Sequence, residues 1–429
     1  MPAEKISIFW FRRDLRLEDN TALTHALNSE YPVLPIFIFD DGILNELDKD
    51  DARVNFIHST LSSISSKINK EFGGSLYVLK GTPLEQWQFL LENYDIQGVY
   101  ANEDYEPYAI KRDSEIKKLL STKAIQLNLY KDQVIFAKND VLKKDNTPYT
   151  VFTPFKNQWL KKFDDSLTSE QKSKNISNFY KTGFPFPSLT DIGFTSSAIE
   201  VKDYRINDLE NYEAERNFPA LDKTSYLSPH LRFGTVSVRK LVKHFKQNAT
   251  FLSELIWREF FMQILFHFPD VVQHNFKRKY DHIPWRNNEE EFEQWKQGKT
   301  GYPMVDAGMR ELNATGYMHN RVRMVVASFL CKHLLIDWRW GEAYFAKKLL
   351  DFELSSNNGN WQWAAGTGCD AAPYFRVFNP SEQVKKFDKN LSYINKWVPE
   401  LNSLEYPAPM VDHKEARERA ISTYKNALS

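Results

Sequence analysis

The sequence predicts two parts of different architecture, a parallel α/β domain followed by an all-α helical domain. From residue 6 to about residue 130, short apolar runs alternate with amphipathic stretches, as strands and covering helices do in a parallel sheet. Beyond residue 207, apolar residues recur at helical spacing. At 429 residues, the chain is also too long for one ordinary core.

The first part, residues 1–130, is expected to be a Rossmann-like domain with a five-stranded parallel sheet. The turn after its first apolar run, at residues 12–20, has no Gly-x-Gly-x-x-Gly pattern. We therefore expect no dinucleotide phosphate cradle of the usual kind there. The five predicted strands are the apolar runs 6–11, 33–39, 76–79, 99–101 and 125–129.

Residues 131–205 are predicted to form a long interdomain connector, because they are rich in Lys, Ser, Thr, Pro and Gly and show little periodicity. Phe152, Phe155 and Trp159 are expected to pin this connector to a protein surface. The remaining residues, 206–429, are predicted to form the helical domain. In that domain the run 252–264 has helical spacing, and 322–336 is predicted to be a second long apolar helix.

Composition excludes several classes of protein. Lys plus Arg and Asp plus Glu both number 56, so any nucleic-acid site must come from a local basic patch. The two cysteines, Cys331 and Cys369, are too few for a four-cysteine metal site, and we expect no structural metal and a reducing compartment. No apolar stretch reaches membrane-spanning length and no signal-peptide pattern is present, so we expect a cytoplasmic protein that does not enter membranes.

The segment 355–375 is unlike an ordinary core, because asparagines, two nearby tryptophans and several glycines are packed together in it. Seven of the eleven tryptophans also fall between Trp257 and Trp363. Amides and indoles in close sequence suit a large flat heterocycle that is both hydrogen-bonded and stacked. The alternative interpretation is a polar loop that its tryptophans anchor to the core.

Two predicted helices carry polar side chains on an otherwise apolar face. Glu254, Trp257, Arg258 and Phe261 share one face of the first helix, which is costly unless they meet a ligand or pair with one another. On the second helix, Asn320, Arg323, Met324 and Ala327 share a face, and Arg323 is expected to pair with an acid such as Asp351. A third group, made by Tyr212, Arg216 and residues 224–228, supplies hydroxyls and amides suited to phosphate oxygens.

Five motifs occur in the order in which they stand in the DNA photolyase and cryptochrome family: 10–17 (Trp-Phe-Arg-Arg-Asp-Leu-Arg-Leu), 254–260, 298–303, 318–321 (Met-His-Asn-Arg) and 357–363 (Asn-Asn-Gly-Asn-Trp-Gln-Trp). The chain resembles that family from about residue 6 to residue 425, and most closely its class I cyclobutane pyrimidine dimer photolyases. The resemblance implies light-driven repair of such dimers in DNA by electron transfer from FAD, which is reduced and anionic when active. It also implies the fold already predicted from the residues.

The resemblance assigns roles to positions of this sequence. The FAD would be lined by Tyr212, Thr224, Ser225, Tyr226, Leu227, Ser228, Arg258, Arg323, Asp351, Phe352, Glu353 and Asn357, with Asn357 facing flavin N5. A tryptophan chain that photoreduces the FAD would consist of Trp361, Trp338 and Trp295. The damaged DNA would contact Arg216, Glu254, Trp257, Arg258, Phe261, Asn320, Arg321, Met324, Trp363 and Gln383. Glu254 would hydrogen-bond a thymine edge or stabilise the reacting dimer.

Several alternatives stay open at this point. A cryptochrome photoreceptor would keep the FAD and the tryptophans but signal through a partner, and a DASH-type protein would act on single-stranded DNA. Asn357, the lesion-facing residues and the absence of a long C-terminal tail favour repair. The antenna chromophore is open between a deazaflavin, another flavin, a folate and none. We expect a monomer without an obligate protein partner, acting on DNA at the bacterial nucleoid.

Overall fold

The computed structural model describes residues 4–428. Its contacts divide the chain into two compact units, which are interleaved along the sequence. The sheet unit contains the chain up to Val141 together with Gln158–Lys202 and Leu227–Leu252. The helical unit contains Leu142–Asn157, Asp203–Tyr226 and the chain from Ser253 onward. Each unit is described by itself below.

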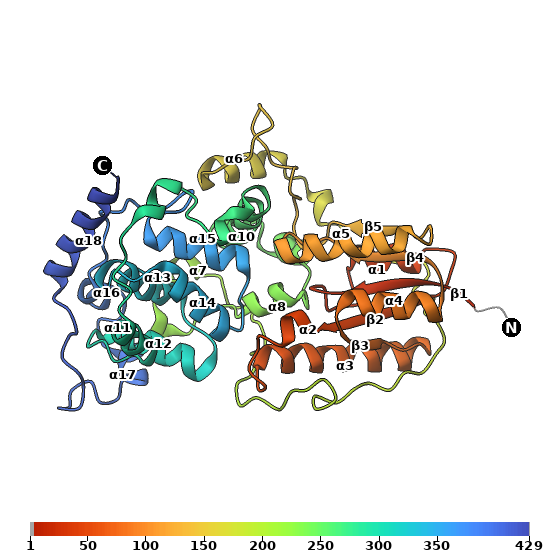
Figure 1. Cartoon of the computed structure of the whole chain (residues 1–429), viewed down its shortest axis with the longest axis horizontal. Coiled ribbons are helices and arrows are strands. Elements are labelled where there is room, and N and C mark those ends of the chain that lie inside the picture. The colour runs from red at the N-terminus through yellow and green to blue at the C-terminus, as the bar shows by residue number, and fades with distance from the viewer. Residues whose placement is uncertain (1–3, 429) are drawn as a thin grey trace. The chain divides into compact units, whose positions relative to one another are not determined.

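The sheet unit is built on five parallel strands in the spatial order β3-β2-β1-β4-β5 (Figure 1). The prediction of a five-stranded parallel sheet followed by a helical domain is confirmed. Because the first strand is central, its carboxyl end and that of β4 meet where the strand order reverses. The strands are β1 (Lys5–Phe11), β2 (Val33–Asp40), β3 (Tyr77–Gly81), β4 (Asp95–Asn102) and β5 (Leu127–Tyr130).

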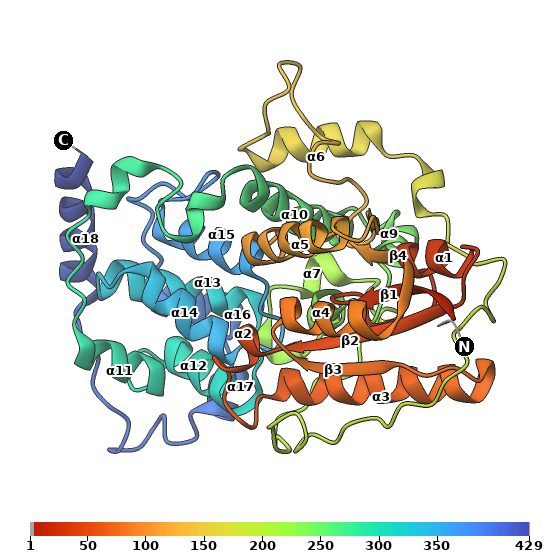
Figure 2. The same cartoon turned by 45° about the vertical axis from the view of Figure 1, so that its right-hand side comes forward.

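Helices cover both faces of this sheet (Figure 2). Along β1, Phe9 and Phe11 point to the face that packs against α1 (Thr21–Leu27) and α3 (Ala52–Phe72). Ile8 and Trp10 alternate with them and point to the opposite face, against α4 (Pro83–Asn93) and α5 (Pro107–Ser121). The two-residue period of the strand therefore divides one apolar run between two cores.

Local sequence fixes where these helices begin and end. Asn20 caps α1 by accepting a hydrogen bond from the N–H of Leu23, and Asp51 caps α3 in the same way. Pro83 occupies the first turn of α4, where its missing N–H costs nothing. Gly73 ends α3 at a φ of 66°, a left-handed conformation that favours glycine. A short helix, α2 (Asp41–Leu44), follows β2 directly.

Two later segments join the sheet unit. Val33 exchanges backbone hydrogen bonds with residues 178 and 180, at N···O distances of 2.8 Å each. Residues 227–252, which we expected in the helical domain, group here because buried Arg239 pairs with Asp19 and Asp132, both at 2.9 Å. These segments contain η1 (Asp165–Thr168), α8 (Leu227–Phe233) and α9 (Val238–Phe245).

The helical unit surrounds a continuous apolar core to which α12, α13, α14 and α15 contribute. The predicted helix 322–336 is interrupted: α13 ends at Ser328, a π-helical turn covers Phe329–His333, and Leu335 has a φ of 52°. The remaining elements are α7 (Tyr212–Glu215), η2 (Pro219–Leu221), η3 (Pro269–Val272), η4 (Arg278–His282), α11 (Glu289–Gln297), α12 (Pro303–Thr315), α13 (Asn320–Ser328), α14 (Trp338–Lys348), α15 (Leu354–Ala365), α16 (Pro380–Phe387), α17 (Ser392–Trp397) and α18 (His413–Leu428).

Two helices contribute residues to both units. Helix α6 (Phe152–Lys162) lies in the predicted connector, and helix α10 (Ala249–His267) carries the first polar stripe. The prediction that aromatic residues pin the connector is confirmed within each unit. Phe155 is fully buried with its ring 5.4 Å from that of Phe260, and Trp159 is buried with its ring 5.3 Å from that of Phe136.

Candidate active site

The unusual segment 355–375 folds into α15 and the turn after it. The side-chain amide of Asn358 donates to the backbone oxygen of Val271 at 2.9 Å, and Gln362 accepts from the N–H of Phe276 at 2.8 Å. Gly359 gives space to Phe261, because a Cβ at position 359 would stand 2.2 Å from that ring. These residues hold protein segments together. Of the two neighbouring asparagines, Asn357 is the one left for a ligand.

Asn357 is anchored by Glu342 on α14. Its Nδ2 donates to the carboxylate of Glu342 at 2.8 Å and to the Glu342 backbone oxygen at 3.1 Å. Both partners are acceptors, so the orientation of the amide is fixed and its Oδ1 is the atom presented to a ligand. Burial raises the pKa of Glu342, and the hydrogen bond from Asn357 opposes that shift. Sequence reasoning did not identify Glu342, because it lies 15 residues away on another helix.

The start of α15 gathers further polar groups. Glu353 is the N-terminal cap residue of this helix and is buried, and Arg258 of α10 lies 3.6 Å from its carboxylate. Ser355 is also buried, and its hydroxyl has no hydrogen-bond partner in the structure. An unpaired buried hydroxyl is costly unless a ligand satisfies it. The orphaned Ser355 Oγ therefore fits a bound polar cofactor, and no motif or periodicity in the sequence singled this residue out.

Arg323 pairs with Asp351, as predicted. Its Nη2 lies 2.9 Å from one carboxylate oxygen and 3.2 Å from the other, and its Nε donates to the backbone oxygen of Met318 at 2.8 Å. The chain continues from Asp351 into Phe352, which is partly buried against the core of the helical unit. The ion pair between Arg323 and Asp351 therefore places charged hydrogen-bonding groups close to the start of α15.

The predicted phosphate-binding residues lie on two short segments. Tyr212 is the first residue of α7, and the guanidinium of Arg216 lies 5.5 Å from the centroid of its ring. Burial raises the pKa of the Tyr212 hydroxyl to about 12. Thr224, Ser225 and Tyr226 lie in the irregular segment before α8, where the backbone oxygen of Ser225 accepts a hydrogen bond from the N–H of Arg205 at 2.8 Å. Leu227 and Ser228 are the first residues of α8 and belong to the sheet unit.

Helix α10 carries the predicted stripe, with one correction to its pairing. Glu254, Trp257 and Arg258 are partly exposed on a helix that is otherwise mostly buried, whereas Phe261 is buried. The alternative of an internal pair between Glu254 and Arg258 is wrong, because Glu254 pairs with Arg216 and Arg258 with Glu353. Burial raises the pKa of Glu254, and the ion pair and hydrogen bond with Arg216 oppose the shift.

Aromatic and polar groups predicted to meet DNA come from four elements of the helical unit. Trp257 lies on α10 and Trp363 on α15, and both are partly exposed. On α13, Asn320 is exposed and Met324 is partly exposed, whereas Ala327 of the same face is buried. Gln383 of α16 has a buried Oε1 without a hydrogen-bond partner.

Arg321 lies in a locally positive environment. Its guanidinium donates to Asn217 at 2.7 Å and lies 4.3 Å above the ring of Phe387. Burial lowers its pKa, and the charges of Arg216 and Arg376 lower it further. Three arginines are thus near enough to repel one another, although the whole chain has no net charge. Such a cluster attracts phosphate groups.

Two of the three tryptophans of the predicted electron chain are in ring contact. The rings of Trp361 and Trp295 are 6.2 Å apart, whereas within residues 4–428 no ring contact joins Trp338 to either. Trp295 and Trp338 are almost completely buried, so neither can exchange electrons with a solute by direct contact. Tyr344 is partly exposed with its ring 5.9 Å from that of Trp295, and sequence reasoning missed it.

The sheet unit has a second candidate cofactor site at the reversal of strand order. Arg12 follows β1 and binds Asp113 at 2.6 Å, while its buried Nε and Nη2 have no hydrogen-bond partner. Arg12 and Arg112 both lie over the ring of Trp10, at 5.3 and 4.9 Å. Ligands of open α/β sheets bind where strand order reverses, and unpaired guanidinium nitrogens there fit a polar ligand.

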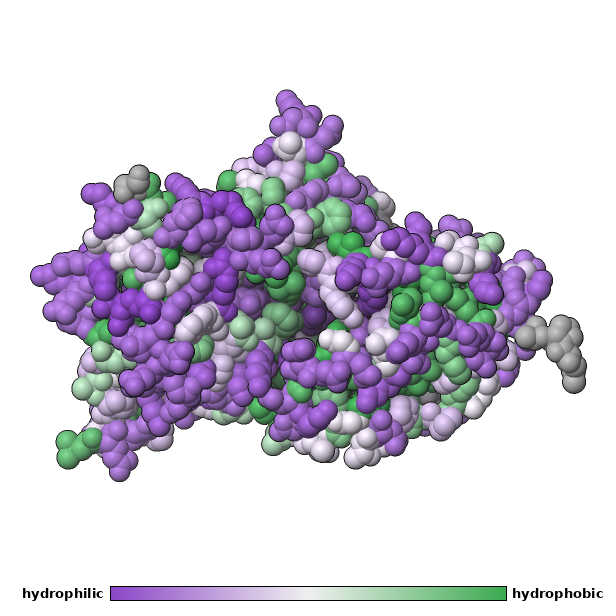
Figure 3. Space-filling view, in the orientation of Figure 1, coloured by the Kyte–Doolittle hydropathy of each residue, from purple (hydrophilic) through white to green (hydrophobic). Residues whose placement is uncertain are grey.

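Across residues 4–428, no group of three or more His, Cys, Asp or Glu side chains is arranged to hold a metal ion. None of the described helices combines the length and the apolar character needed to cross a bilayer. The face drawn in Figure 3 is mainly hydrophilic.

Family models match both parts of the chain. Residues 7–174 match the model described as DNA photolyase, and residues 251–405 match the FAD binding domain of DNA photolyase. The chain is 37% identical to the deoxyribodipyrimidine photo-lyase of Agrobacterium fabrum, over 97% of each protein.

Solved structures are similar over nearly the whole chain. A bacterial class III photolyase from Agrobacterium tumefaciens matches with a TM-score of 0.89 and 34% identity, covering 100% of this chain and 98% of the other. An archaeal photolyase from Sulfolobus tokodaii matches with a TM-score of 0.86 and 37% identity, covering 98% and 99%. That second structure contains two FAD molecules, with the implication of a novel light-harvesting cofactor.

Proposed function

Because the chain belongs to the DNA photolyase family, we propose that it repairs cyclobutane pyrimidine dimers in DNA, using light and a bound FAD. It is a deoxyribodipyrimidine photo-lyase. The observation that carries the proposal within the structure is the stripe on α10, where an acid, an indole and a guanidinium are partly exposed on an otherwise apolar helix. That arrangement suits a ligand with both flat apolar and hydrogen-bonding surfaces.

The chain's own residues fit an FAD. The pair made by Arg323 and Asp351, the unpaired Oγ of Ser355 and the fixed Oδ1 of Asn357 would hold its polar groups. When bound and reduced, FAD supplies the light-driven electron that opens the cyclobutane ring and takes the electron back afterwards. Asn357 presents an uncharged acceptor, and therefore adds no second negative charge beside a reduced, anionic flavin.

The dimer must leave the base stack before it can react. Flipping costs a few kcal/mol, and less for a damaged pair that stacks poorly. Trp257 and Trp363 would offset this cost, since a base stacked on an aromatic ring gains roughly 1 to 3 kcal/mol. Asn320, Met324 and Gln383 would line the rest of the pocket, and Arg321 would hold a backbone phosphate.

Glu254 is proposed to serve the dimer directly. Because burial raises its pKa, a proton on this carboxyl is held more readily than on an exposed glutamate. Glu254 would hydrogen-bond a thymine edge, or stabilise the reacting dimer when it carries a proton, and its ion pair with Arg216 holds the ionised side chain in place. Replacing Glu254 by Ala is expected to lower the repair yield about tenfold, the value of one hydrogen bond of ~1.4 kcal/mol, without releasing FAD.

Electrons for recharging an oxidised cofactor are proposed to come through Trp361, with Trp295 in ring contact behind it. Tyr344 lies between Trp295 and solvent-accessible surface, and its hydroxyl donates to Asn313 at 2.6 Å. Trp338 is proposed as a second donor, with its indole N–H bound to Asn275 at 2.8 Å. An external thiol would return an electron to Tyr344, the outermost residue of this path.

A light-harvesting chromophore is proposed for the sheet unit, at the site around Arg12 and Trp10. The unpaired guanidinium nitrogens of Arg12 suit a flavin or a deazaflavin, both of which carry carbonyl oxygens on a flat ring. The protein is proposed to act as a monomer on chromosomal DNA, hence in the cytoplasm at the bacterial nucleoid.

The test is illumination of the reduced, FAD-loaded protein with duplex DNA that contains one defined thymine dimer. We expect restored thymines under blue or near-ultraviolet light and none in the dark. The Glu254→Ala variant, with its FAD content checked by absorbance, is illuminated in parallel and is expected to give about a tenfold lower repair yield. No splitting in either duplex or single-stranded DNA would refute repair, and splitting confined to single strands would identify a DASH-type activity instead.

A further inference from the structure

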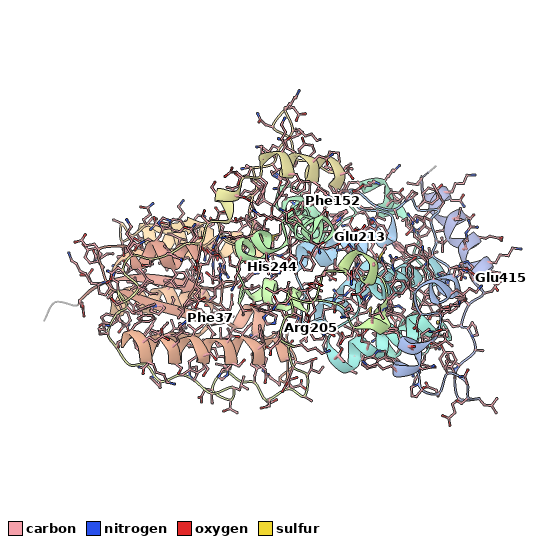
Figure 4. The ribbon with its side chains drawn as sticks, turned by 180° about the vertical axis from the view of Figure 1, so that it is seen from behind. Phe37, Phe152, Arg205, Glu213, His244 and Glu415 are labelled. Carbon is pink, nitrogen blue, oxygen red and sulfur yellow. The ribbon has the colours of Figure 1, made fainter. Side chains whose placement is uncertain are left out.

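We propose that Phe152, at the start of α6, is a positioning residue for the DNA lesion site because it supports the indole of Trp257. The inference rests on the proposed function, in which Trp257 is the surface on which a damaged base stacks. Phe152, labelled in Figure 4, belongs to the connector predicted from sequence, where it was expected only to pin that segment to a protein surface.

The two rings lie flat against each other. Their centroids are 3.6 Å apart and their planes are inclined by 7°. Phe260 meets the same indole edge-on at 5.5 Å, and Phe261 lies 5.4 Å from it. Phe152 is 8% exposed, whereas Trp257 is partly exposed. One face of the indole is therefore occupied by protein, and a base must stack on the part that Phe152 leaves free.

Two hydrogen bonds within the helical unit hold this segment in place. The backbone N–H of Phe152 donates to Asp370 at 3.0 Å. One turn further, Lys156 donates to Ser253 of α10 at 2.7 Å. The segment is thus tied both to α10 and to the turn after α15. A ring fixed in this way is a support for Trp257 and not a removable cover.

Loss of the support from Phe152 is expected to lower affinity for the dimer. A stacked aromatic pair gains about 0.5 to 1.5 kcal/mol, and immobilising a free side chain at an interface costs a similar amount. Without Phe152, Trp257 would have to be ordered by the incoming base. Affinity for the dimer is then expected to fall about 3- to 10-fold, while affinity for undamaged duplex, which depends on phosphate contacts, stays unchanged.

The experiment measures binding by the FAD-loaded full chain in the dark. Fluorescence anisotropy gives the Kd for a duplex with one thymine dimer and for the same duplex undamaged. Phe152→Leu removes the ring but keeps apolar volume, and Phe152→Tyr restores a ring. Phe155→Leu is the matched control, since it removes a ring from the same helix that contacts Phe260 and not Trp257. FAD content and Tm are recorded for each variant.

Support for the proposal is a 3- to 10-fold loss of dimer affinity in Phe152→Leu, with recovery in Phe152→Tyr and unchanged binding of undamaged duplex. Should Phe152→Leu fail to fold, Asp370→Ala removes the backbone anchor without touching the ring and is expected to weaken dimer binding in the same direction. Tighter dimer binding in Phe152→Leu would mean that the ring occupies the place of the base, and would overturn the proposal.

Two further outcomes separate this inference from the proposed function. If Trp257→Ala loses dimer affinity while Phe152→Leu does not, or if Phe155→Leu loses as much as Phe152→Leu, the role of Phe152 is refuted and lesion binding stands. If the wild-type protein does not distinguish dimer from undamaged duplex, the proposed function itself fails, and the inference fails with it.

Discussion

At the scale of single residues, hydrogen-bond partners decide what a side chain can offer to a ligand. Asn357, Asn358 and Gln362 all carry side-chain amides on one helix. Asn358 and Gln362 are bound to backbone groups of the segment 271–276. Asn357 alone is turned by Glu342 so that its oxygen is free to accept. The same residue type therefore serves packing at one position and the cofactor at the next.

The first prediction concerns the Glu342 anchor. Glu342→Ala removes the carboxylate that accepts from the Nδ2 of Asn357 and leaves only the backbone oxygen of residue 342 as a partner, which is expected to cost about 1 kcal/mol of unfolding free energy. Glu342→Gln keeps an acceptor oxygen and is expected to lose less than half as much. Denaturant unfolding of the FAD-loaded protein measures both values. Equal losses in the two variants would show that the charge, and not the acceptor, matters.

The second prediction separates the two indoles of α15. Trp361 is buried and touches Trp295, so Trp361→Phe is expected to block photoreduction of oxidised FAD while repair by chemically reduced protein stays near normal. Trp363 is partly exposed, so Trp363→Phe is expected to weaken dimer binding several-fold, by roughly 1 kcal/mol, and to leave photoreduction intact. Absorbance during illumination and dimer Kd are the two measurements. Loss of both activities in Trp361→Phe would contradict the division.

At the scale of elements, α18 is held to the end of α15 by a buried cluster. The hydroxyl of Tyr424 and the amine of Lys332 both donate to the backbone oxygen of Ala365 at 2.7 Å. The amine also lies 3.6 Å above the ring of Tyr424. Burial lowers the pKa of Lys332 from 10.5 to about 7. The attachment of the last helix is therefore linked to pH.

The third prediction follows from the sign of that shift. Between pH 7 and pH 10.5 the unfolded chain binds a proton at Lys332 that the folded chain does not, so this residue's contribution to stability rises with pH. Relative to Lys332→Met, the wild type is expected to gain up to about 1.4 kcal/mol per pH unit from pH 7 to pH 9. Denaturant melts at both values measure the difference, and a difference that does not change with pH would refute the shift.

At the scale of the whole molecule, charge distribution matters more than net charge. The chain has 56 basic and 56 acidic residues, but Arg216, Arg321 and Arg376 lie close enough to lower the pKa of Arg321. A neutral protein with a local basic cluster binds DNA through few phosphate contacts, each of which releases counterions.

The fourth prediction is that this arginine cluster determines how steeply DNA affinity falls with salt concentration. The logarithm of the DNA affinity is expected to fall linearly with the logarithm of salt concentration, and Arg321→Gln is expected to make the slope shallower by about one. Affinity for damaged and undamaged duplex should fall together in this variant. Lys385→Gln, which removes an exposed cation paired with Glu382, is the control and should leave the slope unchanged.

The sequence by itself determined the fold class and the five strands, and it proposed most residues of the candidate site. Strands and helices bury their apolar residues at fixed periods, so the apolar run 6–11 indicated a strand, and Glu254, Trp257 and Arg258 a polar stripe on a helix. The pairing of Arg323 with Asp351, which belong to nearby motifs, was also predicted from the sequence.

Tertiary structure decided the partners that come from distant parts of the chain. Glu342 beside Asn357, Arg216 beside Glu254 and Phe152 on Trp257 join residues that are 15, 38 and 105 positions apart. Such contacts leave no periodic signal, because they depend on how helices pack and not on the repeat within one helix. For the same reason, the ring contact between Trp361 and Trp295 and the grouping of residues 227–252 with the sheet followed only from the folded chain.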